Sequence, residues 1–215
     1  VHLLNASGNA ATISDADGAG TITNDDTCSP PGTVYIDDSW FGTAIGDDPD
    51  GSGPAQSFGC DSFDKIQDGV NGVALGGTVI VNAGTYHEDV SINNAGLQLL
   101  GAGANVVTLS GAIGGDGAPV HVQASNVTIA GLSITRDGNN TTDWNNPNLN
   151  TVGIAIQGTS ITGTLIRDNV LNGNRAGIDI NNSNGHTIRN NTIDFNRVGV
   201  IFRNQTDSEI VTENF

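Results

Sequence analysis

Short alternations of apolar and polar residues recur along the last third of the chain. Residues 164–171 align with 186–193 and with 208–215, at an offset of 22 residues both times. A second block recurs at 152–156, 176–180 and 198–202, at offsets of 24 and 22 residues. Asn150, Asn174 and Asn196 precede these blocks in register. Alternation with a period of two predicts β-strands.

One strand of this kind cannot bury its apolar side alone. Coils of chain stacked about 4.8 Å apart would bury it and form a continuous core of Ile, Val and Leu. Asparagines at turn positions can stack in hydrogen-bonded ladders, and Asn tolerates the left-handed backbone of sharp corners. A helical solenoid is disfavoured, because segments this rich in Asn, Gly and Thr form poor helices.

The pattern continues upstream in a looser form. Ile129, Leu132 and Ile134 have the same spacing as their counterparts in the 164–171 copy, and further strand patterns occur at 77–81, 97–101 and 120–122. We therefore expect about five to six coils. Residues 137–150 are too many for a corner and predict a projecting loop.

A short helix is predicted before the first coil. Phe63, Ile66, Val70 and Val73 follow helical spacing, and Asp61 and Ser62 are candidate N-terminal caps. Over residues 62–73 its apolar face would cover the first coil, as the terminal caps of solenoids do.

Residues 76–88, Gly-Gly-Thr-Val-Ile-Val-Asn-Ala-Gly-Thr-Tyr-His-Glu, resemble the opening of pectin-lyase-fold proteins with PbH1 repeats. The resemblance covers residues 61–215 and implies an all-β fold, a right-handed parallel β-helix. It leaves function open, because this fold hosts lyases, hydrolases, epimerases, adhesins and tail spikes.

The first 27 residues resemble a different family. Residues 1–8 and 18–26 are similar to the last two strands of a Calx-beta domain. Two strands are marginal in water, so this ribbon either belongs to a fragment or completes a sheet in another subunit. In that family a terminal acidic pair binds calcium, and Asp25 and Asp26 match it.

Two cysteines, Cys28 and Cys60, flank an acidic segment that we expect to be a loop. A disulfide between them would close 33 residues and stabilise the fold by roughly 3–4 kcal/mol in the chain-entropy model. Two buried free thiols are the alternative. The chain thus divides into a ribbon (1–27), an acidic loop (28–60) and a β-helix (61–215).

The net charge of the chain limits the kinds of partner it can bind. The net charge is −16, and residues 1–64 contain 11 acidic side chains and no Lys or Arg. Such a chain repels nucleic acid and anionic membranes, and it has no apolar run of 18 residues that would insert into a bilayer. The acidity and the cysteine pair favour a secreted or cell-surface protein.

Asp48, Asp50 and Ser52 match the first half of a Ca²⁺-binding loop, with oxygen ligands at positions 1, 3 and 5. Position 12 is Gly59, where an EF-hand has Glu. The alternatives are therefore a Ca²⁺ site of another type and a solvated acidic loop.

An enzymatic interpretation depends on stacked charges. Arg167 and Arg189 recur one coil apart, and Asp168, Asp179 and Asp194 would supply carboxylates for a polysaccharide lyase or a glycoside hydrolase. The repeat alone explains this spacing, because outward positions recur in every coil. The motifs of polygalacturonases and the Arg-x-x-Pro motif of lyases are absent.

We therefore expect a non-catalytic structural or adhesive module of a large bacterial surface or filament protein. Its expected partners are other copies of itself or further domains at both ends, and a polysaccharide, with Trp144 on the projecting loop as the candidate sugar contact. The alternatives are a β-helix enzyme acting on carbohydrate and a carbohydrate-binding module.

Overall fold

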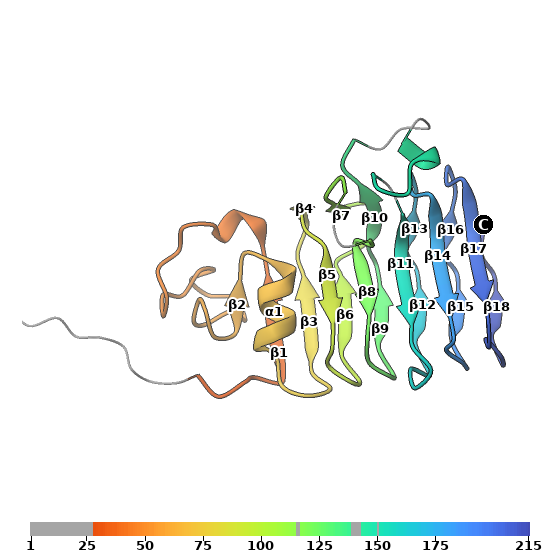
Figure 1. Ribbon diagram of the computed structural model, residues 1–215. Helices are drawn as coiled ribbons and strands as arrows, with labels where there is room; N and C mark the ends of the chain where they lie inside the picture. Colours follow the sequence, from red (N-terminus) through yellow and green to blue (C-terminus); the bar gives the residue numbers. More distant parts are fainter. Residues whose placement is uncertain (1–27, 115–116, 139–142, 150) are drawn as a thin grey trace, which may run out of the picture.

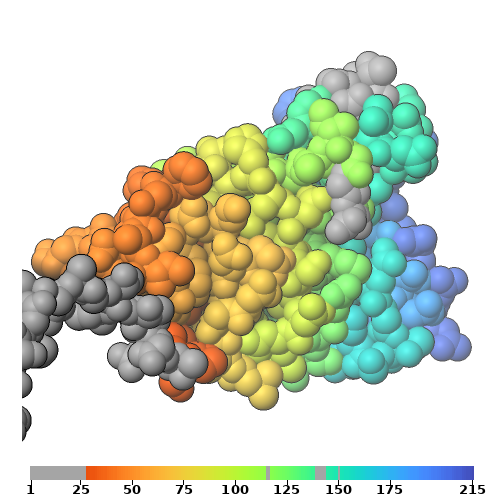
Figure 2. Space-filling model, turned by 60° about the vertical axis from the view of Figure 1, so that its left-hand side comes forward, coloured from red at the N-terminus to blue at the C-terminus, as the bar shows by residue number. Residues whose placement is uncertain are grey.

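The chain forms a right-handed parallel β-helix in the computed structural model, which describes residues 28–114, 117–138, 143–149 and 151–215 (Figure 1). Residues 1–27, including the Calx-beta-like ribbon and Asp25 and Asp26, lie outside the described residues. The stack runs from the cysteine-bridged segment at one end to the last coil at the other (Figure 2).

Three parallel sheets form the walls of the solenoid. The first sheet has the order β18-β15-β12-β9-β6-β3-β1-β2, with strands β1 (Thr33–Ile36), β2 (Ser62–Phe63), β3 (Thr78–Val81), β6 (Gln98–Gly101), β9 (Thr128–Ala130), β12 (Leu165–Arg167), β15 (Thr187–Arg189) and β18 (Ile210–Thr212). The second has the order β16-β13-β10-β7-β4, with β4 (Gly84–Tyr86), β7 (Val107–Gly111), β10 (Ser133–Arg136), β13 (Val170–Leu171) and β16 (Thr192–Ile193). The third has the order β17-β14-β11-β8-β5, with β5 (Val90–Ile92), β8 (Val120–Val122), β11 (Val152–Gln157), β14 (Ala176–Asn181) and β17 (Val198–Arg203).

Each coil contributes one strand to each sheet. The coils begin with β3, β6, β9, β12 and β15, and β18 begins a sixth. Strands pair in register, so that Ile129, Ile166 and Ile188 form one inward column in which every side chain is fully buried. The predicted five to six coils are confirmed.

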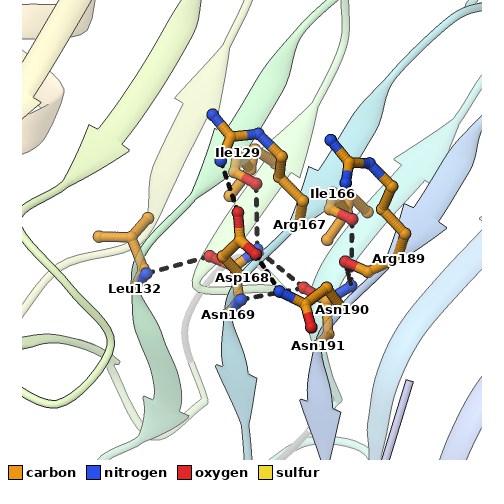
Figure 3. Close-up of polar contacts among 9 residues, drawn as sticks. All are labelled: Ile129, Leu132, Ile166, Arg167, Asp168, Asn169, Arg189, Asn190 and Asn191. Atoms are coloured by element: carbon orange, nitrogen blue, oxygen red, sulfur yellow. Dashed lines mark hydrogen bonds and ion pairs between the residues drawn. The ribbon is translucent and has the colours of Figure 1, made fainter. Parts of the chain in front are cut away.

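Asparagine ladders run along two corners, as the sequence predicts. In one, the Asn169 backbone N–H donates to Oδ1 of Asn191 at 3.0 Å (Figure 3), and the Asn191 backbone N–H donates to Oδ1 of Asn214 at 3.0 Å. In the other, Asn174 N–H donates to Oδ1 of Asn196 at 2.9 Å. Asn150 lies outside the described residues.

At the corner of the Asn169–Asn191–Asn214 ladder, the first residue of each turn has a left-handed backbone. Gly131, Asp168, Asn190 and Glu213 occupy equivalent positions with φ of 74°, 58°, 56° and 55°. This left-handed backbone is least costly for Gly and tolerated by Asn and Asp. From β9 onward, the two-residue turn between the first and second sheets has this conformation in each coil.

The helix α1 (Ile66–Gly72) covers the first coil, but it is shorter than the predicted 62–73. The predicted caps Asp61 and Ser62 are wrong, because Ser62 belongs to β2 and the Asp61 carboxylate accepts the N–H groups of Gln56 and Ser57. The cap comes instead from Glu88, whose carboxylate accepts the N–H of Ile66 at 2.7 Å and of Gln67 at 2.9 Å. Burial raises the pKa of Glu88.

The segment 28–60 is closed by a disulfide between Cys28 and Cys60, whose Cα atoms lie 5.6 Å apart. It is more than a loop, because it contains β1, which pairs with β3 from Thr33 opposite Thr78 onward. Val34 and Ile36 of β1 are fully buried against the first coil. The sequence does not reveal this strand, since a single four-residue alternation has no repeat.

Candidate functional site

A groove lies on the outer face of the third sheet, over β8, β11, β14 and β17. His121, Ala155, Asp179 and Ile201 occupy one outward column there, each paired in register with the next. The loop residue Pro147 lines one side, and the groove has a volume of about 480 Å³. This size is typical of ligand sites.

Arginine gathers in this groove. Arg175, Arg197 and Arg203 line it, which is three of the seven Lys and Arg residues of the chain. Arg197 is exposed, and Arg175 is half-buried beside the projecting loop. In a chain of net charge −16, the groove is a local concentration of positive charge.

Asp179 is the acidic residue among the described groove-lining residues, and its side chain is held by Arg203. Arg203 Nε donates to Oδ1 of Asp179 at 2.9 Å, and Nη2 donates to Oδ2. Asp179 is 4% exposed. The hydrogen bond with Asp179 raises the pKa of the Arg203 guanidinium, and the two side chains form a bidentate pair.

The loop beside the groove is held by Trp144, which lies in the short helix η2 (Asp143–Asn145). Trp144 Nε1 donates to the carbonyl of Gly173 at 3.1 Å, and the Trp144 carbonyl accepts from Arg175 Nη1. The indole N–H is thus used to fix the loop on the stack. Sugar contact by Trp144 stays a prediction.

The residues proposed for catalysis are divided among different parts of the solenoid. Arg167 and Arg189 lie next to each other on β12 and β15 of the first sheet, and Arg167 Nη1 contacts Oδ2 of Asp168 at 2.5 Å (Figure 3). Asp179 lies on the third sheet, and Asp194 follows β16 of the second. The structure therefore brings Arg167, Asp168 and Arg189 together and separates them from Asp179 and Asp194.

Two further groove residues, His121 and Gln157, were not singled out from the sequence. The repeat does place them at outward strand positions, in register with later coils. The repeat does not indicate that residues 143–149 lie beside this sheet. Pro147 of that loop forms one side of the groove.

The carboxylates of the candidate calcium loop stabilise its turns. Asp48 Oδ1 accepts the N–H groups of Asp50 and Gly51 at 3.2 and 2.7 Å, and Asp50 accepts those of Gly53 and Ala55 at 2.9 and 3.1 Å. Within the described ranges, no three His, Cys, Asp or Glu residues are placed to hold a metal ion. Calcium binding through Asp48, Asp50 and Ser52 stays a prediction.

His186 is buried inside the solenoid, where its Nδ1 accepts the N–H of Thr164 at 3.1 Å. Burial lowers its pKa from the ordinary 6.5 to about 4. As pH falls below 6.5, the unfolded chain binds a proton that the folded protein does not bind until about pH 4. The contribution of neutral His186 to the free energy of unfolding is therefore complete above pH 6.5. It falls by about 3 kcal/mol as the pH is lowered to 4.

The variant His186→Thr, which repeats the residue found one coil earlier, isolates this effect. Urea unfolding at about pH 7 and about pH 4.5 should show a smaller loss of stability in the variant than in the native chain. An equal loss in both proteins would show that His186 is not the titrating group.

The strand order, the in-register coils and the groove place this chain among the right-handed parallel β-helices of the pectin-lyase type. The chain belongs to the family described as periplasmic copper-binding protein (NosD), whose profile matches residues 64–215. No curated protein matches the chain.

Solved structures are similar at low sequence identity. ORF18 of Geobacillus virus E2 is 17% identical with a TM-score of 0.56, covering 83% of this chain and 35% of that one. A pectin methylesterase variant in complex with a hexasaccharide is 14% identical with a TM-score of 0.49, covering 74% of this chain and 54% of that one. The chain thus spans about a third to a half of the length of these two proteins.

No helix of the described residues is long and apolar enough to cross a membrane.

Proposed function

We propose that this NosD-family β-helix is a non-catalytic adhesive module that recognises an acidic polysaccharide in the groove of its third sheet. The observation that carries the proposal is the presence of Arg175 and Arg197 in one groove of an otherwise acidic chain, beside Arg203, which is paired with Asp179. Guanidinium groups bind carboxylates and sulfates in planar, often bidentate geometry. A groove that crosses several coils suits an extended chain of sugars.

The carboxylate chemistry of the groove favours binding over cleavage. Glycoside hydrolysis needs two carboxyl groups flanking the bond, and the described lining contributes Asp179, whose oxygens are bound by Arg203. The remaining alternative is a lyase that uses His121 or an arginine as the base. Ultraviolet absorbance of unsaturated product from polygalacturonate or alginate would reveal it, and we expect none.

Replacing Arg197 by glutamine tests the groove. Arg197 is exposed, so the change should leave the fold intact while removing one charged contact to the ligand. We expect about tenfold weaker binding of polygalacturonate by isothermal titration calorimetry. Fully methyl-esterified polygalacturonate should bind weakly to both proteins, because its carboxyl groups carry no charge.

The matched control is Arg189→Gln, which removes another exposed arginine, from the first sheet. It should bind polygalacturonate as the native protein does. Equal weakening by both variants would indicate a response to net charge alone and would contradict a site in the groove.

The family description names copper, but the described residues do not fit a copper site. Copper is bound by His, Cys and Met, whereas the two cysteines are joined, methionine is absent and His186 is buried with Nδ1 accepting a backbone N–H. His87 Nδ1 contacts Oδ1 of Asp137 at 2.9 Å, and His121 lies apart in the groove. We therefore propose no copper-dependent step for this chain.

We also propose a location outside the cytoplasm, because the family is described as periplasmic and the disulfide needs an oxidising compartment. Further coils, domains or copies are proposed as partners of the last coil. Ile210 and Val211 of β18 are 54% and 45% exposed, whereas Ile188, the partner of Val211, is fully buried. Chemical cross-linking followed by mass spectrometry would show whether residues 1–27 or the last coil contact a second copy.

A further inference from the structure

The disulfide-closed segment and α1 lie at the opposite end of the molecule from the last coil (Figure 1), and residues of both line a second hollow. Its volume is about 510 Å³, which is enough for a small organic molecule. We call it the cap pocket; its lining residues include Ile45, Phe58, Phe63, Asp64, Asp68 and both cysteines of the disulfide.

The walls of the cap pocket are apolar. Phe58 and Phe63 are half-buried, and Ile45 is 77% exposed at its edge although it is a large aliphatic side chain. Covering such surface with the apolar body of a ligand is favourable, because apolar area leaves water. The pocket therefore offers a driving force for binding that does not depend on charge.

Two carboxylates set the charge of the ligand. Asp64 and Asp68 both line the cap pocket, and no described lining residue is Lys or Arg. The surrounding residues 28–75 contain eight Asp and one Lys. That lysine, Lys65, lines a neighbouring hollow together with Glu88. Burial raises the pKa of Glu88, and the charge of Lys65 opposes this rise.

An anion would be repelled by Asp64 and Asp68, and a neutral ligand would gain nothing from their charges. A cation is attracted by Asp64 and Asp68 while its apolar part covers Ile45 and the phenyl rings. Rings of Phe58 and Phe63 also attract cations through their faces.

We propose that the cap pocket is a binding site for an organic cation with an apolar body, such as an arylalkyl ammonium compound. The site goes beyond the proposed function, since it lies on the cap rather than in the polysaccharide groove and selects the opposite charge. Binding here leaves the groove free.

The test uses the full chain and three probes of the same shape: phenethylammonium, phenethyl alcohol and phenylacetate. Saturation-transfer NMR and calorimetry should rank their affinities with the cation first, the alcohol second and the anion last. Equal binding of all three, or no binding of the cation, would overturn the proposal.

Two variants locate the site. Asp68→Asn removes a carboxylate from an exposed position in the first turn of α1 and should weaken the cation about fivefold with little effect on the alcohol. Ile45→Ser should weaken both the cation and the alcohol. The control Asp207→Asn removes the same charge near the last coil and should leave both affinities unchanged; weakening by this control as large as that by Asp68→Asn would refute a local site.

Discussion

Replacing Asn191 by alanine is expected to lower the free energy of unfolding by about 3–5 kcal/mol. The Asn191 side chain is fully buried and satisfies groups on both neighbouring coils. Its Oδ1 accepts the N–H of Asn169 at 3.0 Å, and its Nδ2 donates to the carbonyl of Ile166 at 3.0 Å (Figure 3). Its Nδ2 also donates to Oδ1 of Asn214 at 2.9 Å. Alanine would leave buried polar groups unpaired, each at a cost of about 1–3 kcal/mol.

The neighbouring variant Asn190→Ala is the control. Asn190 is exposed and holds the left-handed corner with φ of 56°, so alanine there should cost about 1–2 kcal/mol. Urea unfolding followed by circular dichroism, together with hydrogen exchange of the backbone N–H of Asn169, measures both effects. A loss for Asn191→Ala no larger than that for Asn190→Ala would show that the ladder is not a main source of stability.

Removing the disulfide with the double change Cys28→Ser and Cys60→Ser is expected to cost about 3–4 kcal/mol. The bond closes 33 residues, and the chain-entropy model assigns this amount to a loop of that length. The loss of stability should be largest at the N-terminal end of the stack, because the disulfide-closed segment contains β1, which pairs with β3 of the first coil. Hydrogen exchange should accelerate most in residues 33–36 and 66–72.

Reduction of the native protein should reproduce the effect of the double variant, which serves as the control for the serine side chains. Coils beyond β9 should keep their exchange rates, because each coil of a solenoid contacts mainly its neighbours. A uniform loss of protection along the whole stack would contradict a local role for the disulfide.

The sequence predicted the solenoid well because repetition multiplies a weak signal. The alternation in β12 alone is three residues long, but its copies at β9, β15 and β18 pair in register with the spacing read from the chain. β1 was missed because Val34 and Ile36 have no copy at that spacing upstream. The helix cap was wrong because Glu88, which caps α1, lies more than 20 residues away in sequence.

The repeat indicated that arginines would stack from coil to coil, but it did not indicate on which sheet face they would form a groove. The sequence predicts that Arg167 and Arg189 stack one coil apart, and Arg175 and Arg197, which recur at the same offset of 22 residues, line one groove. Arg167 and Arg189 recur in the same way but lie on the first sheet, where Asp168 and Asn190 are their neighbours. Periodicity gives the coil position of a side chain without telling which of three sheet faces is bordered by a loop.

The sequence by itself determined a solenoid of stacked strands, its coil length and its asparagine ladders, because each of these follows from local spacing. The resemblance to pectin-lyase-fold proteins added the right-handed parallel β-helix, and the structure decided that Cys28 and Cys60 are joined rather than free. The tertiary structure alone decided which face became the groove and where the cap pocket formed. Both hollows depend on contacts between segments far apart in the chain: the Trp144 loop beside the third sheet, and the disulfide segment beside α1. Such contacts are set by the packing of whole elements, which no repeating pattern of apolar residues encodes.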